Sequence, residues 1–197
     1  MRSASLLLSR PLAVACLTLA AVGTAQACGL ENPDSVAGQR GLMNLAFPKA
    51  AWVSTAVWQA QKEGLLPSDA LAGRSDITPQ ARASLQLMRT NGLLKGLAKR
   101  LDSTAGPGDR PAIAVVLMGP MLWSRVEPRD GAIATRAQIH VDGPEPGDVV
   151  LVTDTPAVEA IVSGQLRFER ALELGVVRLY GSAALVGAVQ AWLGSAQ

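Results

Sequence analysis

The chain has 197 residues, of which 18 are basic, 16 acidic, one histidine and two cysteine. This near balance of charge argues against an extended nucleic-acid surface, which needs a basic patch interleaved with aromatic side chains. The part of the chain that follows residue 27 has one histidine and one cysteine, which cannot provide three nitrogen or sulfur ligands for a structural zinc in one subunit. We therefore expect no nucleic-acid partner, no metal and no cofactor.

Residues 1–27 have the pattern of a cleaved secretory signal peptide. Two arginines precede an apolar run from Leu12 to Val22, and Ala25-Gln-Ala27 is the small-x-small sequence that signal peptidase reads. The apolar run is about half of the roughly 20 residues that a membrane-spanning helix needs. We expect a periplasmic or secreted protein with no stable membrane span. A lipoprotein modified at Cys28 is the alternative, although Gln26 departs from the usual lipobox.

Signal cleavage would also change the composition. It removes Arg2, Arg10 and Cys16, which leaves 16 basic and 16 acidic residues and Cys28 as the single thiol. No intrachain disulfide can then form. A mature chain of this length buries nearly 70% of its unfolded surface, which is enough for one hydrophobic core.

Residues 28–102 predict a helical N-terminal region. The segment from Lys49 to Gly64 has an apolar band too broad for a half-exposed helix, with Trp52 and Trp58 on nearly opposite sides. We expect one tryptophan to pack into the core and the other under a neighbouring element; a ligand contact is the alternative.

A second long helix is predicted to open at Thr78-Pro79 and to run through Leu101. Lys95, Lys99 and Arg100 lie near its end, where cations suit the helix dipole. We interpret these three charges as a solvated face rather than an anion site.

Residues 103–111 predict a linker, because glycine and proline interrupt the helical pattern there. The hydrophobic period then changes to two, as is typical of strands. Three antiparallel strands are predicted, with turns at Gly119-Pro120 and at Arg129-Asp-Gly131: Ala112 to Met118, Met121 to Glu127, and a half-exposed strand through Ala137, Ile139 and Val141.

The segment from Asp148 to Trp192 predicts strand, helix, helix, strand and helix, with glycine at nearly every joint. Thr155 is expected to cap the first helix, Gly164 to end it and Ser182 to cap the last one. The predicted elements are Asp148 to Asp154, Thr155 to Gly164, Arg167 to Leu174, Val176 to Tyr180, and a final helix with Leu185, Val189 and Trp192 on one stripe.

This order of elements, from Thr78 to Gln197, resembles that of sterol carrier protein (SCP-2-like) domains. The most specific segments are VLVTDTPAVEAIVSG (150–164), ALELG (171–175) and VRLYG (177–181). The resemblance implies an α+β fold: a five-stranded, mainly antiparallel sheet covered by helices. The domain would span 112–197, with helix 78–101 packed against it, and the N-terminal helical region has no counterpart in the family.

The same resemblance implies an apolar tunnel for fatty acyl chains, sterols or similar lipids. Ordinary core packing is the alternative for every lining residue, because a core and a lipid tunnel use the same side chains. The implied lining residues are Trp123, Ile161, Phe168, Leu172, Leu185, Val189 and Trp192.

Catalytic motifs are missing from the sequence. There is no Gly-x-Ser-x-Gly elbow, phosphate loop, dinucleotide fingerprint or Cys-x-x-Cys-His haem motif. His140 and Asp142 lie two residues apart on one strand face and cannot orient each other as a triad does, so we expect an exposed strand histidine. Asp142, Glu145 and Asp148 are interpreted as part of a turn rather than a calcium site.

We therefore expect an exported, non-catalytic protein that carries or senses an apolar ligand such as a lipid or fatty acyl chain. The alternative is a periplasmic accessory or adaptor protein that docks a protein partner through its added helices and Trp52 and Trp58. An enzyme that uses His140 with nearby carboxylates is a third hypothesis.

Overall fold

A computed structural model of the protein describes residues 36–68, 75–103, 110–128 and 135–195. The helices are α1 (Val36–Ala46), α2 (Trp52–Lys62), α3 (Pro79–Ser103), α4 (Thr155–Ser163), α5 (Phe168–Glu173) and α6 (Ala183–Ser195). The strands are β1 (Ile113–Leu117), β2 (Leu122–Pro128), β3 (Thr135–Ile139), β4 (Val149–Thr153) and β5 (Arg178–Tyr180). The α+β class predicted from the sequence is confirmed.

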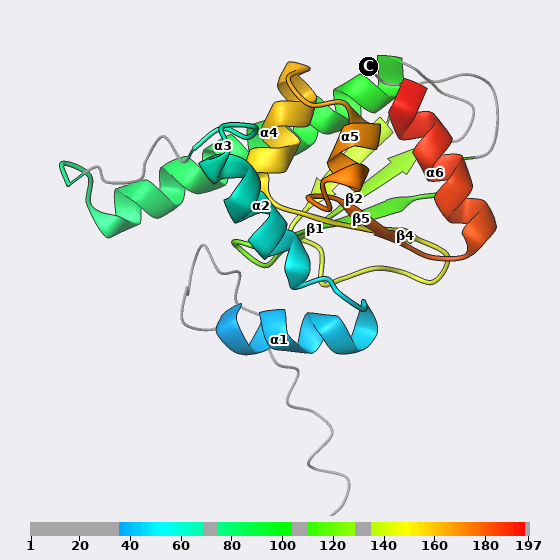
Figure 1. The fold of residues 1–197 in the computed structure, drawn as a ribbon, viewed down its shortest axis with the longest axis horizontal. Helices are drawn as coiled ribbons and strands as arrows, with labels where there is room; N and C mark the ends of the chain where they lie inside the picture. The colour runs from blue at the N-terminus through cyan, green and yellow to red at the C-terminus, as the bar shows by residue number, and fades with distance from the viewer. Residues whose placement is uncertain (1–35, 69–74, 104–109, 129–134, 196–197) are drawn as a thin grey trace, which may run out of the picture.

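The strands form one mixed sheet in the order β3-β2-β1-β4-β5. Three neighbouring pairs are antiparallel, and the central pair of β1 and β4 is parallel. Figure 1 shows α4, α5 and α6 lying across the sheet, with α1 apart from them at one end. Because Leu117 pairs with Thr153, β1 and β4 end at the same edge of the sheet. This edge positions the candidate site.

Burial explains why the two central strands show no alternation in sequence. Every residue of β1 and of β4 is buried, whereas β2 alternates between buried and half-buried positions. Strands covered on both faces have continuous apolar runs, and strands covered on one face alternate. The core therefore extends to both sides of the β1–β4 pair.

The ends of α4 depend on two residues. The N-cap of α4 is Asp154 rather than Thr155, because Asp154 Oδ1 accepts the Thr155 N–H at 2.8 Å. The helix ends at Gly164 as predicted, with φ of 79° in the left-handed region that glycine tolerates. Ser182 also acts as predicted, since its Oγ accepts the Leu185 N–H at 3.4 Å.

Strand β5 begins later than the sequence predicts. The N–H groups of Val176 and Val177 donate to the carbonyl of Ala171 at 3.1 and 3.2 Å. Both residues are buried, and their N–H groups close the end of α5 instead of joining the sheet. The β-branched pair is therefore part of the helix terminus, and pairing with β4 starts at Arg178.

Trp52 and Trp58 are both exposed, at 65% and 57%, so the prediction that both would be packed is wrong. Helix α2 packs through a narrow stripe of Val53, Val57 and Ala60. This stripe is sufficient to attach the helix, and the two indole rings lie outside it. The Lys62 ammonium lies 4.1 Å from the centre of the Trp58 ring.

Helices α3 and α4 pack closely because α3 carries a glycine at their contact. A Cβ at Gly96 would lie 3.0 Å from Val162 Cγ1. Arg100 Nη1 donates to the carbonyl oxygens of Ile161 and Val162 at 2.9 Å each. Lys95 and Lys99 are exposed as expected, but Arg100 is not part of a solvated face. Its long side chain reaches the unpaired carbonyls at the end of α4.

Arg100→Ala is expected to lower the free energy of unfolding by about 1 kcal/mol, because two terminal carbonyls of α4 lose a charged donor. Urea denaturation measures the change. Lys99→Ala is the matched control, since its side chain is exposed on the same helix and should have little effect. Equal effects of the two substitutions would contradict the capping role of Arg100.

Several predictions concern residues outside the described ranges, and the structure changes the placement of His140. The signal peptide, Cys28, most of the 103–111 linker and the 129–131 turn lie outside the described ranges. His140 is exposed as expected, but it follows the end of β3 with φ of 66° rather than lying in the strand. Of the helices described, none has both the length and the hydropathy to cross a membrane.

Asp148 fastens the loop before β4 to β2. Arg125 Nε and Nη2 donate to the two Asp148 carboxylate oxygens at 2.9 and 3.0 Å, and Arg125 also pairs with Glu145 at 3.1 Å. The hydrogen bond that Arg125 donates to Asp148 raises the pKa of the Arg125 guanidinium. Glu145 N–H donates to Asp148 Oδ2, as expected of a turn.

Candidate functional site

The space expected for a lipid tunnel is occupied mainly by side chains. Phe168, Val189 and Trp192 are buried members of the hydrophobic core, and Leu172 and Leu185 are half-buried and pack against it. Trp192 Nε1 donates to the Leu101 carbonyl at 3.2 Å, which joins α6 to the end of α3. These contacts are those of a packed core.

A pocket of about 170 Å³ remains on this side of the sheet, between α3, α4 and the start of α5. Of the seven predicted lining residues, it includes Ile161 and Phe168. Ligand pockets usually have about 300–1,000 Å³, so this volume is small for a sterol or a long acyl chain. Leu172, Leu185, Val189 and Trp192 do not line it.

Trp123 lies on the face of the sheet away from α5. Trp123 pairs with Val116, and Val116 pairs with Val152, so these three side chains lie on one face of the sheet. The next residue, Thr153, faces α5, because its hydroxyl donates to the Val176 carbonyl just after that helix. Successive strand residues point to opposite faces, so Trp123 points the other way. There it packs beside Phe47, with ring centres 6.1 Å apart. The structure therefore separates Trp123 from the other predicted residues.

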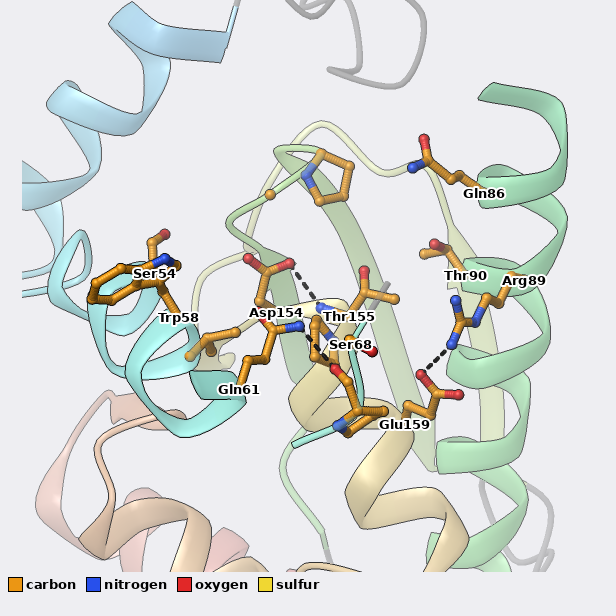
Figure 2. Close-up of a pocket in the computed structure, with 15 residues that line it drawn as sticks. Ser54, Trp58, Gln61, Ser68, Gln86, Arg89, Thr90, Asp154, Thr155 and Glu159 are labelled. Carbon is orange, nitrogen blue, oxygen red and sulfur yellow. Dashed lines mark hydrogen bonds and ion pairs between the residues drawn. The ribbon is translucent and has the colours of Figure 1, made fainter. Parts of the chain in front are cut away.

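A larger pocket of about 450 Å³ opens between α2, α3 and the beginning of α4. Figure 2 shows Trp58 of α2 on one side and Arg89 of α3 on the other, with Asp154 and Thr155 between them. Its apolar lining comes from Val57, Trp58, Pro67, Pro120 and Pro156. Its polar lining comes from Ser54, Gln61, Ser68, Gln86, Arg89, Thr90, Asp154, Thr155 and Glu159.

The sheet topology brings two distant turns together in this pocket. The chain leaves β1 at Gly119-Pro120 and leaves β4 at Asp154-Thr155, both at the edge where these parallel strands end. A Cβ at Gly119 would lie 2.8 Å from Asp154 Oδ1. Glycine is therefore needed for the turn to approach the carboxylate this closely.

The Asp154 carboxyl is held in place by backbone groups. It accepts hydrogen bonds from the N–H groups of Thr155 and Gly119, and both favour the ionised form. Burial has the larger effect and raises the pKa of Asp154 above its ordinary value, although the positive charge of Arg40 opposes the shift. The carboxyl is therefore costly to ionise without a further positive charge nearby.

Arg40 attaches α1 to the same turn. Its Nε donates to the Met118 carbonyl at 2.8 Å, and its guanidinium also donates to the Gly119 carbonyl. Across the pocket, Arg89 forms an ion pair with Glu159 at 2.5 Å, which joins α3 to α4 (Figure 2). Both ion-pair side chains are partly exposed, so the pair is screened by solvent.

The lining is suited to binding by hydrogen bonds, charge and apolar contact. Its described residues include no histidine, cysteine or lysine. No group of three or more histidine, cysteine, aspartate or glutamate side chains that could hold a metal occurs among the residues that the structure describes. Two carboxylates and one guanidinium are the charged groups of the described lining.

Local sequence signals predict the components of this pocket only separately. Gly119-Pro120 predicts a turn, and Asp154-Thr-Pro156 predicts a strand-to-helix junction. One sequence signal could have indicated the pocket: β1 and β4 are buried strands that both end abruptly at turns containing proline. Only the parallel pairing of β1 with β4 places these turns side by side.

Comparison with protein-family models gives no match, and no curated protein matches the sequence. Among solved structures, the chain is similar to a conserved hypothetical protein of Thermus thermophilus, described as "possibly sterol carrier protein". The identity is 23%, the TM-score is 0.32, and the match covers 55% of this chain and 84% of the other. A similarity of this size carries no argument about ligand or function.

Proposed function

We propose that the protein is an exported, non-catalytic binding protein for a small apolar or amphipathic ligand. The observation that supports this function is the pocket of about 450 Å³ between α2, α3 and α4, which has the volume of a ligand site. The ligand would occupy this pocket rather than a tunnel beneath α5 and α6. Export is supported by the signal-peptide pattern of residues 1–27.

The composition of the pocket supports a ligand with both apolar and polar parts. Trp58 and three prolines provide flat apolar surface, and the hydroxyl and amide groups beside them can fix a polar end. No catalytic motif was found in the sequence, and the described lining offers no histidine or cysteine for nucleophilic or acid–base chemistry.

Trp58→Ala is expected to weaken ligand binding by about tenfold, because it removes the largest apolar surface of the pocket. Native mass spectrometry of the mature protein, followed by lipid extraction, would identify a co-purifying ligand. Trp52→Ala is the matched control: it removes an exposed tryptophan of the same helix that does not line the pocket. Absence of any bound ligand in wild-type protein, before and after incubation with a lipid panel, would overturn the function.

A periplasmic accessory or adaptor protein is the second candidate, and exposed hydrophobic side chains favour it. Leu42 and Leu45 of α1 are 64% and 82% exposed, and Trp52 is 65% exposed. Exposed apolar side chains of this size are common at interaction surfaces. A pull-down from periplasmic extract, with a Leu42→Ser, Leu45→Ser variant as control, tests this function. Equal capture by the two proteins would contradict it.

A further inference from the structure

The two carboxylates that line the α2–α3–α4 pocket have different hydrogen-bond partners: one is paired with a cationic side chain and the other with backbone N–H groups. Arg89 is paired with Glu159, whereas the Asp154 carboxyl receives its hydrogen bonds from the backbone. Within the described part of the chain, no cationic side chain hydrogen-bonds to Asp154, because Arg40 donates to two backbone carbonyls instead. The described lining therefore carries one negative charge more than positive when both carboxyls are ionised.

The beginning of α4 offers no free backbone N–H groups to an anionic ligand. The Thr155 N–H donates to Asp154 Oδ1, and proline at 156 has no N–H. The N–H groups of Ala157 and Val158 donate to the Asp154 carbonyl at 3.0 and 3.1 Å. A helix N-terminus binds anions through unpaired N–H groups. In the first turn of α4 these N–H groups are already hydrogen-bonded to Asp154.

Trp58 supplies apolar contact rather than a further cation site, because the Lys62 ammonium already lies 4.1 Å from the centre of its ring. The apolar surfaces of Trp58 and Pro156 border the same space as Asp154. An amine with a hydrocarbon chain matches both the carboxyl and the apolar walls.

We propose that the ligand of this pocket is a small organic cation, an amphipathic amine whose ammonium group pairs with Asp154 and whose hydrocarbon part contacts Trp58 and Pro156. This inference rests on the proposed binding function and specifies its ligand class. Arg40 acts on this carboxyl only through its charge, because its guanidinium donates to backbone carbonyls, and the incoming ammonium supplies the direct charged hydrogen bond.

Isothermal titration calorimetry of the mature protein with hexylamine, 1-hexanol and hexanoate tests this inference. The three probes share a six-carbon chain and differ in charge. In low-salt buffer, hexylamine is expected to bind about tenfold more tightly than either other probe, because the ammonium gains a charge-assisted contact. Equal or tighter binding of hexanol or hexanoate overturns the cation assignment but keeps the binding function. Binding of none of the three overturns the binding function itself.

Asp154→Asn should remove the roughly tenfold preference for hexylamine over hexanol. Asparagine keeps an oxygen that can cap α4, so the variant is expected to fold, and thermal unfolding checks this. Glu173→Gln is the control, because Glu173 is an exposed carboxylate of α5, paired with Arg170 and outside the pocket. An unchanged hexylamine preference in folded Asp154→Asn overturns the assignment.

Discussion

Trp192→Ala is expected to lower the free energy of unfolding by about 3–5 kcal/mol, the range for truncation of a large buried aromatic side chain. Trp192 is 7% exposed, and its indole N–H donates to the Leu101 carbonyl. The Arg110 guanidinium lies 4.9 Å from the ring centre. The substitution would therefore leave a cavity and remove this hydrogen bond where α6 meets α3. Urea denaturation measures the loss.

Two control variants separate the contributions of Trp192. Trp192→Phe retains an aromatic ring but loses the hydrogen bond, so we expect a smaller loss of stability than in Trp192→Ala. Trp52→Ala removes a tryptophan that is 65% exposed and should change stability by about 0.5 kcal/mol or less. If Trp192→Ala costs no more than Trp52→Ala, Trp192 does not hold the core together at this position.

Asp154→Ala is expected to destabilise the fold by about 1–2 kcal/mol, because α4 loses its N-cap and the Gly119 turn loses an acceptor. Asp154→Asn should cost less, since its amide oxygen can accept the Thr155 N–H. A comparison of both variants by urea denaturation at neutral pH tests the cap. Equal losses would show that the charge, not the cap, is what stabilises this junction.

Wild type and Asp154→Asn should also differ in their response to pH. Burial raises the pKa of Asp154 above its ordinary value of 3.8, so the folded protein retains a proton that the unfolded chain releases. Between 3.8 and the raised pKa, this group therefore makes stability fall as the pH rises. Asp154→Asn lacks that contribution, and its stability should fall less across the same window. Parallel pH profiles of unfolding for wild type and variant would contradict the shift.

Local sequence signals predicted most of the element order, because they depend on residues close together in the chain. Gly164 ends α4 and Ser182 caps α6 through contacts within one turn. The start of β5 was misplaced because Val176 and Val177 have high strand propensity, yet their N–H groups bond to Ala171. The hydrogen bonds that close the end of α5 are also local, but a valine side chain does not indicate that its N–H group will form them.

The candidate pocket could not be predicted in this way. Trp58, Arg89 and Asp154 come from three segments far apart in the sequence, and hydrophobic periodicity does not report which segments meet. For the same reason, the pattern that placed Val189 and Trp192 on one apolar face could not distinguish a lipid tunnel from a packed core. Their burial and the Trp192–Leu101 hydrogen bond are tertiary facts.

The sequence by itself determined the α+β class, the order of helices and strands, and the lack of recognisable catalytic motifs, since each follows from local pattern and composition. Only the tertiary structure decided that β1 and β4 are parallel neighbours, that Trp52 and Trp58 are exposed, and that Asp154 borders a pocket. The physical reason is that strand pairing and helix packing are contacts between distant segments. A side chain's propensity is local, but its burial and its partners depend on what the rest of the chain places beside it.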